Sequence, residues 1–220
     1  MTAILTGFAC LVLVSAAAGS QLQTIDFSTF PPDSVVPQDF YQAQGIIFNE
    51  DYGVGFIQGD EALDSSSVVQ LGDSAQIGAT FTAPVTTLSV EVAPEFGGTG
   101  EYTLTAFDSG GQAVATKSVT RTEDPGDPAD QGFGYFTVDL GPRPGPARSF
   151  ILTNRFIRSS SGTPMCGGGG LACFGFGVST ITYTIQLDPT TKDQCQNGGW
   201  RNFPQFKNQG QCIAFVNHRP

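Results

Sequence analysis

The sequence predicts an all-β protein: an antiparallel β-sandwich of the jelly-roll type with a small helical appendage at the C-terminus. Apolar and polar residues alternate with a period of two through most of the chain, which is the pattern of strands with one buried face. Glycine and proline are frequent, at 28 and 14 of 220 residues, and supply turns between strands. With 40% hydrophobic residues, a chain of this length can fill a core between two sheets.

Residues 1–20 have the pattern of a cleavable signal peptide. An apolar run over residues 3–14 is followed by small residues over 15–20, and the run is too short to span a bilayer. Two cleavage positions fit the small-residue pattern, after Ala18 and after Ser20. We therefore expect a secreted, extracellular protein without a transmembrane segment in the mature chain.

Residues 21–187 are predicted to form the sandwich. The clearest strand is the last, in which Ile181, Tyr183, Ile185 and Leu187 share one face and Thr182, Thr184 and Gln186 occupy the other. The same alternation recurs over residues 87–92, 102–107 and 136–140. The turn residues at 108–111 lie between two alternating stretches and predict a hairpin.

The remaining residues, 188–220, are predicted to form a linker and a helical tail. This segment has four basic and two acidic residues, whereas the rest of the chain is strongly acidic. Thr191 and Gln194 have capping-box spacing for a short helix, and Asn208 precedes a second predicted helix that carries Cys212. A unit of about 30 residues cannot bury enough apolar surface alone, so we expect a disulfide to stabilise it.

Four cysteines follow the predicted signal peptide: Cys166, Cys173, Cys195 and Cys212. An even number in an exported chain favours disulfides, and sequence proximity favours Cys166–Cys173 and Cys195–Cys212 among the possible pairings. A zinc site is the alternative. It is disfavoured because neither pair has the close spacing of zinc-ribbon ligands.

Two segments carry a family resemblance. Thr24-Ile25-Asp26-Phe27 leads through Phe40-Tyr41 to Gly45-Ile46-Ile47-Phe48, and the closing strand runs from Phe174 to Tyr183. On these motifs, residues 23–187 resemble secreted bacterial jelly-roll domains of the galactose-binding-like and carbohydrate-binding-module type. The resemblance implies a structural calcium near the first strand, at Asp26. Val178-Ser179 departs from it, because such domains often carry Asp-Asn there. The tail resembles a short terminal segment found on many exported bacterial proteins.

An acidic stretch supplies further candidate calcium ligands, Glu123, Asp124, Asp127 and Asp130. Calcium takes six to eight oxygen ligands, which carboxylates and carbonyls of a loop rich in proline and glycine can supply. The spacing does not match an EF-hand loop. The alternative is a solvated loop whose charge keeps strand edges apart.

Tyr52 and Asp51 are the candidate ligand-binding residues. A sugar ring stacks on an exposed aromatic side chain while polar groups hold its hydroxyls, and Tyr52 lies in a predicted loop among hydrogen-bond acceptors. The alternative is an ordinary half-buried loop tyrosine.

Charge and composition disfavour several other functions. A net charge of -10 argues against nucleic-acid binding. The one histidine, His218, is the third residue from the end of the chain, which disfavours catalysis by a serine–histidine–aspartate triad. A glycosidase would have to use carboxylates such as Glu91 and Glu101, which occupy outward positions on predicted strands. The favoured function is a secreted, non-catalytic module that binds a glycan or a similar extracellular ligand. The alternatives are a structural cell-surface or matrix protein and, third, a carboxylate-dependent glycoside hydrolase.

Overall fold

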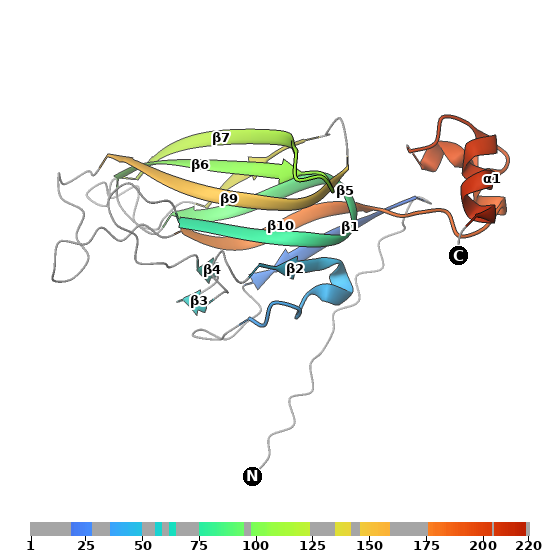
Figure 1. Ribbon diagram of the computed structural model, residues 1–220. Helices are drawn as coiled ribbons and strands as arrows, with labels where there is room; N and C mark the ends of the chain where they lie inside the picture. Colours follow the sequence, from blue (N-terminus) through green and yellow to red (C-terminus); the bar gives the residue numbers. More distant parts are fainter. Residues whose placement is uncertain are drawn as a thin grey trace, which may run out of the picture.

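The computed structural model shows a body of β-strands with a small helical unit at the C-terminal end (Figure 1). It describes residues 19–27, 36–49, 56–58, 62–64, 75–94, 98–123, 135–141, 146–158, 176–203 and 205–218. The strands are β1 (Ser20–Asp26), β2 (Ile46–Phe48), β3 (Phe56–Gln58), β4 (Ala62–Asp64), β5 (Ala75–Pro94), β6 (Gly98–Phe107), β7 (Ala113–Glu123), β8 (Phe136–Asp139), β9 (Ala147–Arg158) and β10 (Phe176–Gln186).

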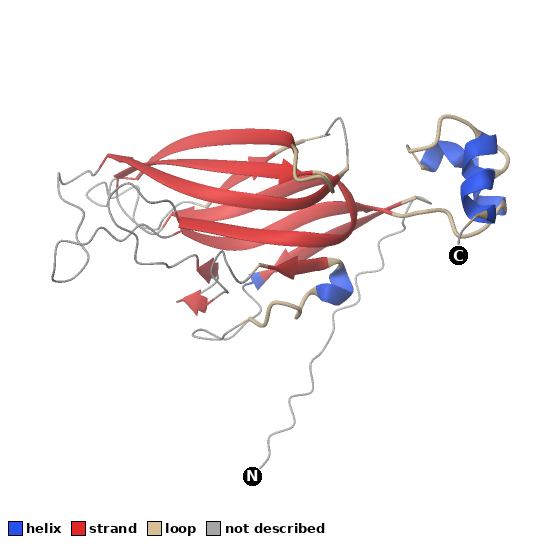
Figure 2. Ribbon diagram, viewed as in Figure 1, coloured by secondary structure: helices blue, strands red, loops and turns tan. Residues whose placement is uncertain are grey.

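The helical elements are short and gather mainly in the tail (Figure 2). They are η2 (Gln42–Gln44), η5 (Asp193–Cys195), η6 (Gly199–Asn202) and α1 (Gln209–Asn217). Within the described ranges, no helix is both long and apolar enough to cross a membrane.

The long strand β5 belongs to two layers. Residues 75–81 pair with β2 and β9, Val85 pairs with both β9 and β10, and residues 87–94 pair with β8 and β10. The register against β9 shifts between Thr80 and Val85, an interval that contains Pro84, which has no N–H to donate to a ladder. The strand order therefore describes one antiparallel sheet folded over on itself. The first layer holds β2, β9, β6 and β7, and the second holds β8, β10, β1, β4 and β3. The predicted antiparallel β-sandwich is confirmed.

Aromatic side chains hold the two layers together. The ring centroid of Tyr102 on β6 lies 4.9 Å from that of Phe136 on β8 and 6.1 Å from that of Phe176 on β10. The centroids of Phe81 on β5 and Tyr183 on β10 are 5.1 Å apart. Because these pairs join strands of different layers, they place the core between the layers.

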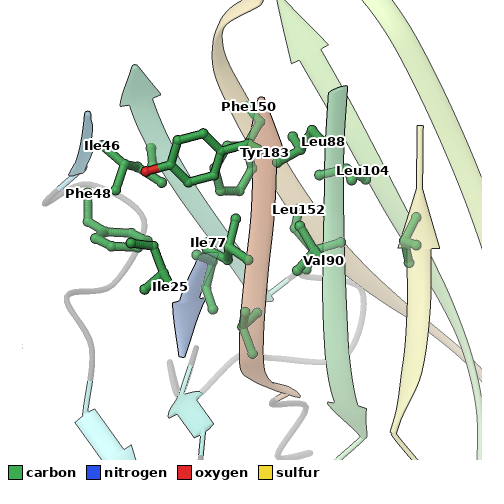
Figure 3. Packing of buried hydrophobic residues seen from close by; sticks show 14 of the residues in the cluster. Ile25, Ile46, Phe48, Ile77, Leu88, Val90, Leu104, Phe150, Leu152 and Tyr183 are labelled. Atoms are coloured by element: carbon green, nitrogen blue, oxygen red, sulfur yellow. The ribbon is translucent and has the colours of Figure 1, made fainter. Parts of the chain in front are cut away.

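Tyr183 lies at the centre of this core, near Ile46 and Phe150 (Figure 3). Its hydroxyl donates a 2.9 Å hydrogen bond to the carbonyl oxygen of Gln44 in η2. A buried hydroxyl without such a partner would be costly, so this bond lets the ring fill the core and anchors η2 to it. Burial also raises the pKa of Tyr183 above its ordinary value of 10.0.

The alternation predicted for the last strand is confirmed in β10 except at Leu187, which follows the end of the strand and is 38% exposed. Ile181, Tyr183 and Ile185 are buried, whereas Thr182 and Thr184 are half-buried on the outer face. Strands β6 and β8 follow the same rule, since alternate residues are buried in each. In these strands, the alternation of apolar and polar residues in the sequence predicts which side faces the core.

The tail begins with the predicted capping box, although the helix that follows is only one 3-10 turn. The Thr191 N–H donates to Oε1 of Gln194 at 3.0 Å, and the Gln194 N–H donates to Oγ1 of Thr191 at 3.4 Å. The turn η5 ends at Cys195 because Gln196 is extended, with φ -78° and ψ 166°. Asn197 then adopts a positive φ of 51° and redirects the chain.

A disulfide joins the two ends of the tail. The predicted bond between Cys195 and Cys212 is present, so these two sulfurs are not zinc ligands. Cys212 lies on α1, the second predicted helix, which begins where the Asn208 side chain accepts a 2.9 Å hydrogen bond from the Gln211 N–H. Phe203 is buried beside the disulfide and completes a small core. The predicted Cys166–Cys173 bond lies outside the described residues.

Stability should fall at alkaline pH because two buried tyrosines must stay neutral. Burial raises the pKa of Tyr183, and burial together with the charge of Asp26 raises that of Tyr41. The unfolded chain loses these protons near pH 10, so their stabilising contribution is complete below that pH and lost as the pH rises through the raised values. Urea titrations on both sides of pH 10 should show this decline. Tyr183→Phe should flatten it, whereas Tyr135→Phe, at a ring that is 45% exposed, should not. An unchanged slope in Tyr183→Phe would contradict the assignment.

Removing the disulfide should unfold the tail and leave the sandwich folded. The bond links residues 17 apart, and the loop-entropy model assigns such a bond about 3 kcal/mol. The tail core is too small to replace that contribution. In the double variant Cys195→Ser/Cys212→Ser, we expect amides of α1 to lose hydrogen-exchange protection while those of β5 and β10 keep it. Equal loss in all three elements would show that the tail is not stabilised separately.

Candidate ligand-binding site

The outer face of the second layer carries the candidate site. We call it the Glu91 face and define it by Thr24 and Asp26 of β1, Ser179, Thr180 and Thr182 of β10, Ser89 and Glu91 of β5, and Thr137 and Asp139 of β8. These strands point their other residues, such as Ile25, Val90 and Val138, into the core. Since side chains alternate along a strand, the polar residues between them face away from it.

A β-bulge lies in the middle of this face. Val178 of β10 is opposite Val92 of β5 and Thr180 is opposite Glu91, so Ser179 is one extra residue on β10. Its side chain is 7% exposed, and its hydroxyl donates a 2.5 Å hydrogen bond to Oε2 of Glu91. Bulges re-aim side chains and are frequent beside functional sites. Here the bulge directs a buried hydroxyl onto a carboxylate.

Strand register aligns four polar side chains in a row through Glu91. Asp26 is opposite Thr180, Thr180 is opposite Glu91, and Glu91 is opposite Thr137. Because neighbouring strands lie about 4.8 Å apart, the row extends roughly 14 Å across the sheet. A second row, two residues along each strand, contains Thr24, Thr182, Ser89 and Asp139.

The face offers acceptors and hydroxyls but no cations. Strands β1, β5, β8 and β10 contain no lysine or arginine. Ser179 is bonded to one oxygen of Glu91, and the other oxygen, Oε1, has no hydrogen-bond donor in the described part of the chain. Oδ1 of Asp139 accepts a 2.8 Å bond from the Gly141 N–H and so closes the turn after β8. Glu91 and Asp139 therefore each keep acceptor capacity for a ligand on this face, and Glu91 lies at its centre beside the bulge.

The sequence contains a signal for the bulge. A prediction that places the binding residues in loops does not use this signal. Apolar residues occur at 176 and 178 and then at 181, 183 and 185, so the period of two slips by one residue. If the apolar residues before and after the slip face the same core, the slip predicts one inserted residue in the strand. The partner of Ser179 could not be found in this way, because Glu91 lies on another strand.

The two carboxylates considered for glycosidase chemistry lie on opposite faces of the molecule. Glu101 projects from the first layer, between the buried Gly100 and Tyr102, and its Oε2 lies 3.5 Å from Nε of Arg155. Glu91 projects from the second layer, away from the same core. Packed layers are about 10 Å apart, so two outward carboxylates are farther apart than a catalytic pair allows. Glu91 and Glu101 do not form such a pair.

Of the candidate calcium ligands, the described residues include only Asp26 and Glu123, which lie in different layers. Asp26 ends β1, which pairs with β10 in the second layer, and its charge helps raise the pKa of buried Tyr41, after burial itself. Glu123 ends β7, which pairs with β6 in the first layer. Asp124, Asp127 and Asp130 lie outside the described residues. Among the described residues, no group of three or more potential metal ligands is present. Calcium binding stays a prediction.

The candidate sugar-binding residues Asp51 and Tyr52 also lie outside the described residues, in the segment after β2. The platform hypothesis therefore stays a prediction. Exposed aromatic rings in the described part of the chain are Phe40 and Tyr135, at 53% and 45% exposure. Neither belongs to the strands that form the Glu91 face.

Comparisons with known proteins give structural likenesses only. No family model and no curated protein sequence matches the chain. Solved structures with a similar fold include two carbohydrate-binding modules. One is CBM36 in complex with calcium and xylotriose (12% identity, TM-score 0.30, 73% of this chain and 98% of that one). The other is CBM32-3 from a family 31 glycoside hydrolase from Clostridium perfringens (12%, 0.35, 73% and 94%).

A larger neighbour is the arabinose-bound MgGH51 α-L-arabinofuranosidase, with 14% identity and a TM-score of 0.42. The match covers 80% of this chain and 27% of that enzyme, so the chain spans about a quarter of its length. Identities this low concern the fold alone. The Glu91 face is accordingly argued from its own geometry.

The hydrogen bond between Ser179 and Glu91 should be measurable as a coupling energy. Hydrogen bonds to charged groups contribute about 1.5–3 kcal/mol, and we expect about 1 kcal/mol because Glu91 is half-buried and partly solvated. Urea unfolding of Ser179→Ala, Glu91→Ala and the double variant gives the coupling directly, because alanine at position 91 removes the acceptor. A parallel cycle with Glu101→Ala and Ser179→Ala should be additive, since these residues lie on opposite faces. Additivity in the first cycle would contradict the bond.

Proposed function

We propose that this protein is an exported, non-catalytic module that binds a glycan through the Glu91 face. The observation that supports the proposal most directly is the row of Asp26, Thr180, Glu91 and Thr137 on four neighbouring strands. A sugar presents several hydroxyls, each able to donate one hydrogen bond and accept others. A row of carboxylates and hydroxyls, spaced by the distance between neighbouring strands, can form such hydrogen bonds with the hydroxyls of an extended glycan chain.

Rigidity supports the same proposal. The groups of the row project from strands that are hydrogen-bonded to one another, so their positions are set by backbone register rather than by loops. Ser179 further restricts the Glu91 carboxylate by bonding one of its oxygens. A ligand then meets a site whose side chains are already ordered, which lowers the entropy cost of binding.

The charge of the face indicates which glycans fit. Asp26, Glu91 and Asp139 bring negative charge, and the four strands of the Glu91 face contain no lysine or arginine. An acidic polysaccharide would be repelled because like charges would face each other across the interface. The ligand class is therefore neutral polysaccharides, or chains that carry amino sugars.

The surroundings of the carboxylates favour binding over hydrolysis. Asp26 is exposed, and Glu91 is half-buried beside hydroxyl groups. The acid of a glycosidase needs apolar surroundings that keep it protonated until it reacts. This face supplies hydrogen-bonding surroundings instead, which suit a carboxylate that accepts hydrogen bonds from a bound sugar.

A glycan array followed by titration of the retained sugars tests the proposal. We expect neutral or amino-sugar polysaccharides to be retained intact, and Glu91→Gln to weaken binding roughly tenfold because a charged hydrogen bond becomes a neutral one. Glu101→Gln is the matched control: it alters an outward glutamate on the opposite face and should leave the affinity unchanged. Retention of no sugar, with or without added calcium, would make the proposal wrong. So would equal losses in the two variants, or turnover of the bound polysaccharide.

A further inference from the structure

The first described residue, Gly19, is built into the contact between the sandwich and the tail. It is buried, and its φ of 115° is a left-handed conformation that favours glycine. Its carbonyl oxygen accepts a 3.0 Å hydrogen bond from the N–H of Leu187, the residue after β10. A Cβ at Gly19 would overlap the carbonyl group of Asn202 in η6. Only glycine fits between these two segments.

Side chains extend the same contact. Nε2 of Gln186, a residue that is 7% exposed, donates a hydrogen bond to Oε1 of Gln205. Nε2 of Gln205 in turn donates to Oδ1 of Asp188 at 3.1 Å. We call Gly19, Gln186 and Asp188 the tail seat. Figure 1 shows the helical unit beyond the start of β1 and the end of β10.

The two cleavage positions that fit the sequence have different consequences for the tail seat. Cleavage after Ala18 leaves Gly19 as the first residue of the mature chain. Cleavage after Ser20 removes Gly19, and with it the carbonyl that holds Leu187 and the surface that meets Asn202. It also removes the pairing of Ser20 with Gln186 at the start of β1. Only the first cleavage leaves the seat complete.

We propose that the signal peptide is removed by hydrolysis of the Ala18–Gly19 bond, which leaves Gly19 as the N-terminal residue on which the tail docks. A signal peptidase adds one water across this peptide bond: Ala18 keeps the carboxylate, and Gly19 carries the new α-amino group. Ala16 and Ala18 supply the small residues that such a peptidase requires. The inference rests on the export part of the proposed function and is independent of glycan binding.

The position of the cut is read directly from the secreted protein. The full chain is expressed in an exporting bacterium, purified from the medium, and analysed by intact mass and N-terminal sequencing. We expect a chain that begins Gly-Ser-Gln-Leu. A chain that begins at Gln21, or one that retains residues 1–18, would overturn the assignment. Glycan retention by the same sample is a separate readout, so failure of the sugar site and failure of this inference are distinguishable.

The role of Gly19 in docking the tail is tested with two mature chains, one beginning at Gly19 and one at Gln21, both with the disulfide formed. We expect the Leu187 amide to exchange roughly tenfold faster in the shorter chain, because it has lost its acceptor. Gly19→Ala in the longer chain should have the same effect, since its Cβ displaces Asn202. Gly111→Ala is the matched control, because Gly111 also has a positive φ, 76°, but no neighbour within 4 Å of its Cβ position. Equal protection of Leu187 in both mature chains would overturn the docking role.

Discussion

The passage of β5 between the two layers is the constraint on which the rest of the structure depends. One strand of 20 residues is hydrogen-bonded to β9 and β2 in one layer and to β10 and β8 in the other. The layers therefore cannot slide past each other without breaking ladder hydrogen bonds. The register change near Pro84 sets where the strand crosses, and the rings of Tyr102 and Tyr183 close the core on either side. The residues on each outer face are consequently held in fixed positions relative to one another by strand pairing.

The Glu91 face is a product of that fixed register and of one departure from it. Regular pairing brings Asp26, Thr180 and Glu91 opposite one another, and the bulge adds the hydroxyl of Ser179 beside them. A bulge disturbs the ladder, and a hydrogen bond to a carboxylate offsets part of that cost. The candidate site therefore lies on paired strands, so the spacing of its polar groups is set by strand register.

The sheet topology also brings the first and last strands of the sandwich together. Because β1 and β10 are antiparallel partners, the start of β1 lies beside the end of β10, from which the tail departs. Gly19 and Leu187 meet at that point, and Asn202 packs over them. The tail depends on its own disulfide for internal stability and on this junction for its orientation.

The sequence by itself determined the features whose causes are local: the period-two strands, the capping box of η5, and the pairing of Cys195 with Cys212. Each depends on residues that are near one another in the chain. Glu91 and Glu101 show the limit of such reasoning. The alternation of apolar and polar residues predicts that both side chains point away from the core. The passage of β5 between the two layers determines that they do so on opposite faces of the molecule. The bond between Ser179 and Glu91 joins residues 88 apart, so only the tertiary structure could reveal it. Strand partners are chosen by packing across the whole chain and not by the residues of either strand alone.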